Sequence, residues 1–111
     1  MPQLTDEEIE TYCMQIIANS GDAHEKAYEA LRAAKAHDFP LAHAKFEEAN
    51  KVLNQAHKFH SEVLKAGANG EIKEETVLLA HAQDHIMSTM TSLDFIKELI
   101  DLYEEIDGHK K

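Results

Sequence analysis

The sequence predicts an all-α protein, folded as an antiparallel three-helix bundle in a single domain that covers residues 1–111. The first observation is composition: the chain has 4 Gly, 2 Pro and no Trp, and a chain with so few helix breakers favours helices. The second is periodicity, because apolar and small residues recur at alternating spacings of four and three in three long segments. The third is the presence of two short turn-forming stretches that separate these segments.

The first helix is expected to begin at a capping box, Thr5-Asp6-Glu7-Glu8. In such a box the Thr hydroxyl accepts from the third helical amide, and the Glu carboxylate accepts from the cap amide. The predicted core-facing row is Ile9, Cys13, Ile16, Ser20, Ala23, Ala27, Ala30 and Ala34. Because Asn19-Ser20-Gly21-Asp22 are poor helix formers, a kink or a short break is expected there.

The second helix is expected to follow a turn at residues 36–40, with Asp38 as its N-cap and Pro40 in its first turn. Its predicted core-facing row is Ala42, Phe46, Ala49, Leu53, Ala56, His60 and Val63. The stretch Gly67-Ala68-Asn69-Gly70 is expected to end the helix. Gly67 is then the candidate for the left-handed residue that follows a helix.

The third helix is expected to start near Ile72 or Lys73 and to run to about Glu105, with residues 108–111 as a frayed tail. Its predicted core-facing row is Leu79, Ala82, Ile86, Thr89, Leu93, Ile96, Ile100 and Tyr103. The acidic residues expected at the positive end of its dipole are Glu71, Glu74 and Glu75. A second apolar row, Val77, Ala80 and Met87 with Met90 beside it, is more than three helices can cover, and it predicts that subunits associate.

Charge and cysteine content exclude several classes of function. With 11 basic and 21 acidic residues the net charge is -10, which argues against binding to nucleic acid or to anionic membranes. No apolar run approaches the roughly 20 residues that span a bilayer, and the N-terminus lacks the features of a signal peptide. The single Cys13 cannot form an internal disulfide. We therefore expect a cytoplasmic protein with no membrane insertion.

The candidate functional residues lie in residues 76–90. His81 and His85 are four apart and share one face of the predicted helix. Asp84 is about 60° of rotation away from His81, and it continues the apolar row of Val77 and Met87, where burial is expected. A histidine pair on one face and a carboxylate on an apolar row need separate explanations.

Several interpretations of the pair compete. One is a polar edge of the bundle, and another is a regulatory or storage bundle with incidental histidines, which leaves Asp84 unexplained. A zinc-hydrolase site is weak, because Ala82 stands where the Glu base would be. A di-iron bundle is weak as well, since no His has an acidic residue three positions before it. The last is phosphoryl acceptance by a neutral imidazole, with His85 or Gln83 holding the transferred oxygens.

The stretch from Val77 to Met87, with His81-Ala82-Gln83-Asp84-His85 at its centre, resembles the signature of the lactose/cellobiose/chitobiose-type IIA proteins of the bacterial sugar phosphotransferase system (PTS). The resemblance covers nearly the whole chain. It includes the Ala-rich first helix, the stretch Ala44-Lys45-Phe46-Glu47-Glu48-Ala49 and the loop Asn69-Gly70-Glu71.

The resemblance implies a homotrimer, which makes a nine-helix bundle. It implies that His81 accepts a phosphoryl group from phospho-HPr and passes it to a cysteine of the cognate IIB, during uptake of a β-linked disaccharide. His85 and Gln83 match the positions that flank the phosphoryl group. Asp84 would meet its two symmetry mates on the trimer axis and share a divalent cation, usually Mg²⁺.

Physical chemistry agrees with that implied role of Asp84, because three carboxylates in close contact repel unless a cation or protons intervene. The alternative for Asp84 is a local hydrogen bond at the edge of the bundle. The alternative for the protein is a helical adaptor or regulator on the same scaffold, which performs no transfer.

Overall fold

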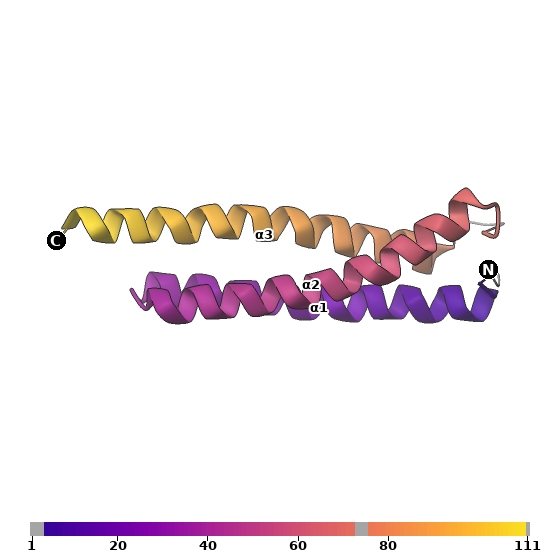
Figure 1. Cartoon of the computed structure of the whole chain (residues 1–111), viewed down its shortest axis with the longest axis horizontal. Helices are drawn as coiled ribbons and strands as arrows, with labels where there is room; N and C mark the ends of the chain where they lie inside the picture. The colour runs from indigo at the N-terminus through magenta and orange to yellow at the C-terminus, as the bar shows by residue number, and fades with distance from the viewer. Residues whose placement is uncertain (1–3, 73–75, 111) are drawn as a thin grey trace.

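The structure, a computed structural model, describes residues 4–72 and 76–110. Its three helices are α1 (Asp6–Lys35), α2 (Phe39–Ala68) and α3 (Val77–Lys110). They run up, down and up along a rod of 59 × 20 × 17 Å (Figure 1). The predicted all-α, three-helix bundle is therefore confirmed. None of the helices in the described residues is both long and apolar enough to cross a membrane.

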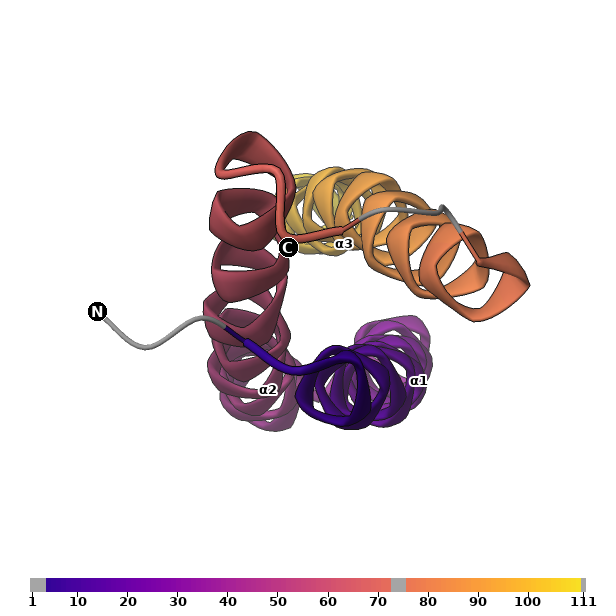
Figure 2. The ribbon, with the colours of Figure 1, turned by 90° about the vertical axis from the view of Figure 1, so that its right-hand side faces the viewer.

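The three helices do not pack equally. α1 packs along both neighbours, whereas α2 and α3 have only a limited contact with each other. Figure 2 shows α2 and α3 diverging at the end of the bundle where α3 begins. One flank of the first turns of α3 is therefore not covered by α2.

The core follows the predicted rows. All eight predicted positions of α1 are buried, and α2 and α3 depart from prediction only at His60 and Tyr103, which are half-buried. Among the described residues, the buried polar ones are Ser20 and Thr89. The Thr89 hydroxyl of α3 donates to the Ser20 carbonyl of α1 at 3.4 Å. The Ser20 hydroxyl has no hydrogen-bond partner among the described residues.

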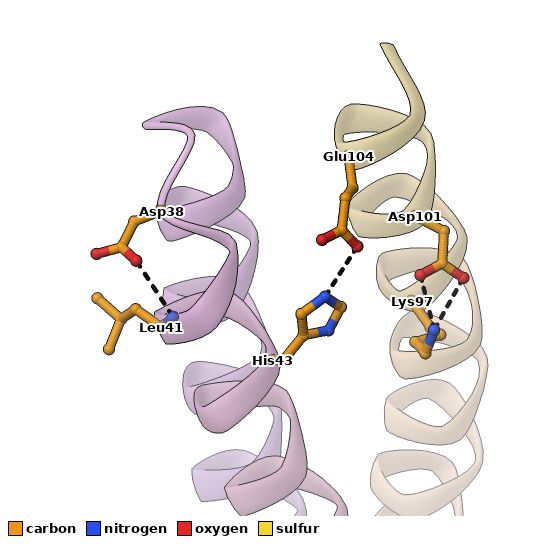
Figure 3. Close-up of polar contacts among 6 residues, drawn as sticks. All are labelled: Asp38, Leu41, His43, Lys97, Asp101 and Glu104. Carbon is orange, nitrogen blue, oxygen red and sulfur yellow. Dashed lines mark hydrogen bonds and ion pairs between the residues drawn. The ribbon is translucent and has the colours of Figure 1, made fainter. Parts of the chain in front are cut away.

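Both predicted N-caps are confirmed. The Thr5 hydroxyl accepts from the Glu8 amide, and the Glu8 carboxylate accepts from the Thr5 amide, each at 3.1 Å. The Asp38 carboxylate accepts from the Leu41 amide at 3.2 Å (Figure 3). Each cap satisfies amides that have no partner inside the helix.

The break expected at residues 19–22 is wrong, since α1 is continuous from Asp6 to Lys35. Ser20 is fully buried in the row that packs on α3, and the Asn19 side chain donates to the Gln15 carbonyl at 2.9 Å. A glycine inside a helix costs only about 1 kcal/mol relative to alanine. Tertiary packing of the apolar face outweighs that local preference.

The ends of α1 and α2 share one hydrogen-bonding motif. After α1, His37 is left-handed at φ 62°, its amide donates to Ala34, and the Asp38 amide donates to Ala33. After α2, Gly70 is left-handed at φ 75°. The Gly70 amide donates to Gly67, and the Glu71 amide donates to Ala66. Both are Schellman ends.

The prediction that Gly67 would be the left-handed residue after α2 is therefore wrong. Gly67 lies within α2, and the reversal falls three residues later. Ile72 folds back to Gly67, where an added Cβ would stand 3.8 Å from the Ile72 Cδ1 atom. This contact beside the last turn favours a helix that extends to Ala68.

The start of α3 was also predicted wrongly. The helix begins at Val77, where the Thr76 hydroxyl accepts from the Leu79 amide at 3.1 Å, and Ile72 is not helical. Glu71 therefore does not lie in the first turn of α3. The predictions for Lys73, Glu74 and Glu75 fall outside the described residues.

The predicted end of α3 near Glu105 is wrong as well, since the helix continues to Lys110 and residues 108–110 are helical. Two contacts hold its last turns against the α1–α2 hairpin. The imidazole of His43 lies 2.9 Å from the Glu104 carboxylate, and that of His37 lies 3.0 Å from the Asp107 carboxylate. Figure 3 shows His43 of α2 and Glu104 of α3 pointing toward each other.

Candidate functional site

His81 and His85 form a contact pair in the second turn of α3. Their Nε2 atoms lie 3.1 Å apart, and the rings meet edge to face with centroids separated by 4.4 Å at 78°. His81 is exposed and His85 is half-buried. The predicted sharing of one helix face is confirmed, and the structure adds that the two outer ring nitrogens point at each other.

A nitrogen–nitrogen contact of this length is a hydrogen bond only if one ring donates its N–H and the other offers a lone pair. At least one of the two rings is therefore neutral in this arrangement. When His85 is the donor, Nε2 of His81 carries the lone pair. That nitrogen is then a nucleophile at the surface of the protein, with a donor N–H beside it.

Asp84 lies on the exposed side of α3, opposite the core. The neighbours that share this row are exposed too: Val77 is 87% exposed and Met87 55%. The sequence-based expectation that this row is buried is therefore wrong for the single chain. A surface row of apolar residues with one carboxylate in its middle is what an interface between subunits provides.

Sequence reasoning missed a further exposed apolar row toward the C-terminus, on the flank of α3 that carries the histidine pair. Four large apolar side chains are exposed there, spaced by four, three and four: Phe95, Leu99, Leu102 and Ile106. Phe95 alone is 67% exposed. The helical spacing was the signal that could have identified them, since it repeats the same four-three alternation at positions outside the predicted core row.

A metal ion at Asp84 needs ligands from elsewhere. The described residues of one chain bring together no group of three His, Cys, Asp or Glu side chains that could hold a metal ion. The Ser88 hydroxyl donates to the backbone carbonyl of Asp84 at 2.7 Å, so this hydrogen bond does not involve the Asp84 carboxylate. The Asp84 carboxylate is a hard oxygen donor at the surface, and it fits a divalent cation only when other copies add theirs.

The structure does not bring Gln83 to His81. At about 100° per residue, two positions turn the helix by about 200°, so the two side chains project from nearly opposite flanks. Gln83 is half-buried on the flank that faces away from the histidine pair. Any support from Gln83 to a group on His81 has to cross from one subunit to another.

The fold and the site define a class: a small helical protein with a histidine pair at its surface, suited to passing a group between proteins. Comparison with known proteins narrows this class. Residues 11–104 match the family model described as PTS system, Lactose/Cellobiose specific IIA subunit. The lichenan-specific phosphotransferase enzyme IIA component of Bacillus subtilis is 42% identical over 101 residues, which are 91% of this chain and 92% of that protein.

Solved structures of related proteins point to the same family. The PTS cellobiose-specific enzyme IIA of Bacillus anthracis has a TM-score of 0.86 at 38% identity, covering 96% of this chain and 95% of that one. The chitobiose IIA protein of Escherichia coli, solved in complex with HPr, has a TM-score of 0.79 at 36% identity, covering 90% and 97%. The chain belongs to the lactose/cellobiose-specific IIA family of the phosphotransferase system. It is a phosphotransferase component that carries phosphoryl groups.

Proposed function

We propose that His81 is the phosphoryl acceptor of this carrier, that HPr is its donor, and that a cysteine of the cognate IIB is the next acceptor. The observation that carries the assignment is the 3.1 Å contact between the Nε2 atoms of His81 and His85, with His81 exposed. The solved complex of a related IIA protein with HPr supports the choice of donor.

The transfer follows from this geometry. The Nε2 lone pair of His81 attacks phosphorus, the bond from phosphorus to the donor breaks, and the donor leaves with that electron pair. Before this attack, the N–H of His85 turns from the Nε2 atom of His81 to an oxygen of the incoming phosphoryl group, which frees the lone pair and stabilises the charge on that oxygen. In the second transfer the IIB thiolate attacks, and His81 departs with the pair. Positioning and charge neutralisation supply the catalysis.

The carrier is proposed to assemble as a homotrimer, giving a nine-helix bundle. The support is the apolar surface that α3 leaves exposed, with Val77 and Met87 on the row of Asp84 and Phe95 further along on the adjacent flank. Three such surfaces facing a common axis would bury these apolar side chains in the manner of a parallel coiled coil. The three Asp84 carboxylates would then meet on the axis, and they would hold a divalent cation, of which Mg²⁺ is the proposed one.

The same assembly gives Gln83 a role. The Asp84 row lies between the flank of His81 and the flank of Gln83, so threefold symmetry turns the His81 flank of one subunit toward the Gln83 flank of the next. The side-chain amide of Gln83 can then donate to the phosphoryl oxygens on the neighbouring subunit. His85 supports the group from within the same chain.

Family members are named for β-linked sugars or related glycans, including lichenan, N,N'-diacetylchitobiose and lactose. We place this chain in the uptake of a β-linked disaccharide of that type, as a cytoplasmic component that contacts proteins and not the sugar. Specificity for the sugar then lies with other components of the system.

The test is transfer from phospho-HPr to the wild-type chain and to His81→Ala, followed by addition of IIB. Wild type is expected to take up the phosphoryl group and deliver it to the IIB cysteine. His81→Ala is expected to take up none while keeping its helical signal and its oligomeric state. Normal uptake by the variant would refute the assignment, and no uptake by a folded wild type would favour the adaptor hypothesis.

A further inference from the structure

The flank of α1 that lies beside the histidine pair carries exposed apolar residues that the proposed chemistry does not use. Two contacts fix how α1 and α3 lie along each other. Thr89 meets Ser20, a sequence separation of 69 residues, and one cavity is lined by Ile9 of α1 together with Leu78 and Leu79 of α3. The helices therefore run parallel in register, and His81 is level with Tyr12.

Rotation about α1 decides which side chains face the histidine pair. Tyr12 faces α2, where its ring lies 5.4 Å from that of Phe59. At about 100° per residue, Met14 is turned about 200° from Tyr12, onto the flank of α1 away from α2. Ile17 follows one turn later on the same flank. Met14 is 54% exposed, and Ile17 is half-buried.

The matching rotation on α3 turns the histidine pair toward this flank. Thr89 contacts α1 and lies four residues after His85, and Leu78, two turns before His85, lines the cavity shared with α1, so the histidine pair lies on the side of α3 next to α1. Met14 and Ile17 therefore lie on the flank of α1 that is next to the histidine pair. An adaptable thioether and a branched aliphatic side chain are typical of the centre of a protein interface.

The charged residues on this part of α1 and α3 are acidic. Within the described residues, neither α1 before Lys26 nor α3 before Lys97 carries a Lys or Arg. Glu10 is exposed one turn before Met14. A phosphoryl group adds about −1.5 to −2 charge at pH 7, so the cations that neutralise it have to come from the partner. A partner with an apolar centre and a basic rim complements this surface.

We infer that Met14 and Ile17 form the apolar contact on which the phosphoryl-donor protein docks, and that Glu10 pairs with a basic residue at the rim of that protein. This inference rests on the proposed function, because it takes phospho-HPr as the occupant. It assigns binding of the donor to α1 and the chemistry to α3. Met14 is thus a docking residue for the transfer and not a catalytic one.

The experiment measures the rate of transfer from phospho-HPr while the concentration of the acceptor chain is varied. Met14→Ser removes the apolar contact without adding charge. Its KM is expected to rise on the order of five- to tenfold, with kcat within about twofold of wild type. Met14→Leu keeps an apolar side chain, and its KM is expected to equal that of wild type. Glu10→Gln is expected to reduce the dependence of KM on salt.

The matched control is Leu41→Ser, which removes an apolar side chain that is 45% exposed at the far end of the bundle. Its KM is expected to equal that of wild type. An unchanged KM in Met14→Ser would overturn the inference. Loss of the wild-type oligomeric state in that variant would also overturn it, because a second copy of the chain would then cover Met14. If wild type itself accepts no phosphoryl group, the proposed function fails first.

Discussion

The Nε2 atoms of His81 and His85 face each other at 3.1 Å across one turn of α3. The contact holds the ring of His81 by its outer nitrogen, which is the atom that a docked protein can reach. It also leaves the partner ring ready to donate to whatever His81 binds. The other features of the site are arranged around this pair: the apolar flank of α1, the Asp84 row and the polar flank of Gln83.

His85→Ala is expected to accept the phosphoryl group more slowly than wild type, but still to accept it. The variant loses the N–H that stabilises the transferred oxygens, while the nucleophile stays in place. Loss of one such donor costs on the order of 10²-fold in rate or more. Stopped-flow transfer from phospho-HPr measures the effect. A rate equal to that of wild type would reduce His85 to a structural residue.

Asp84→Leu is expected to keep or strengthen the proposed trimer while removing the cation proposed on its axis. Three leucines on the axis pack together, whereas three carboxylates need an ion between them. Metal analysis of the purified trimer, or anomalous scattering from crystals, reports the ion. Asp22→Leu at an exposed position of α1 is the control, and it should retain the ion. An ion still on the axis in Asp84→Leu would rule out the proposed ligand.

Phe95→Glu is expected to convert the trimer to monomers. The side chain is 67% exposed in the single chain, and in the proposed assembly a glutamate there would be buried in the contact between subunits. Analytical ultracentrifugation measures the mass in solution. Leu41→Glu, away from α3, should remain trimeric. A trimer in both variants would show that Phe95 does not lie in the contact between subunits.

Ser20→Ala is expected to stabilise the fold. The Ser20 hydroxyl is fully buried without a partner among the described residues, and such a group costs about 1 kcal/mol or more. Alanine also has the higher helix propensity, a gain of up to about 0.5 kcal/mol. Ser61→Ala, at an exposed position of α2, gives the propensity gain alone. Denaturant unfolding of both variants isolates the hydroxyl effect, and equal gains would contradict this account.

Acid is expected to destabilise the fold in part through His60. Burial lowers the pKa of His60, and the neighbouring His57 lowers it further. The unfolded chain therefore binds this proton more readily than the folded chain. Stability is full above the ordinary histidine pKa of about 6.5 and declines as the pH falls below it.

His60→Gln cannot take up the proton, so its unfolding midpoint should fall less between about pH 7.5 and 5 than that of wild type. His109→Gln, at an exposed position near the end of α3, is the control and should behave like wild type. Identical slopes in His60→Gln and wild type would contradict the role of His60.

The helices and their core rows could be predicted because their signals are local. The alternating spacing from Ile9 to Ala34 fixes a face, and the side chains of Thr5 and Asp38 bond amides only three residues away. The continuity of α1 through Gly21 and the length of α3 could not be predicted in the same way. Both depend on contacts between helices, such as Thr89 with Ser20 and His43 with Glu104.

For the site, the spacing of His81 and His85 predicts a shared face, but spacing alone does not set the rotamers that bring the two Nε2 atoms together. Asp84 was singled out because it breaks an apolar row. The structure shows that this row is exposed in the single chain, which no single segment of the sequence made plain. The separation of Gln83 from His81 needed only the helical rotation, which the sequence already contained.

The most direct test of the central claim is the intact mass of the chain after incubation with phospho-HPr. The account predicts one added phosphoryl group per chain, lost on brief acid treatment and mapped to His81. A phosphoryl group on another residue, or no added mass on the folded wild-type chain, would contradict it.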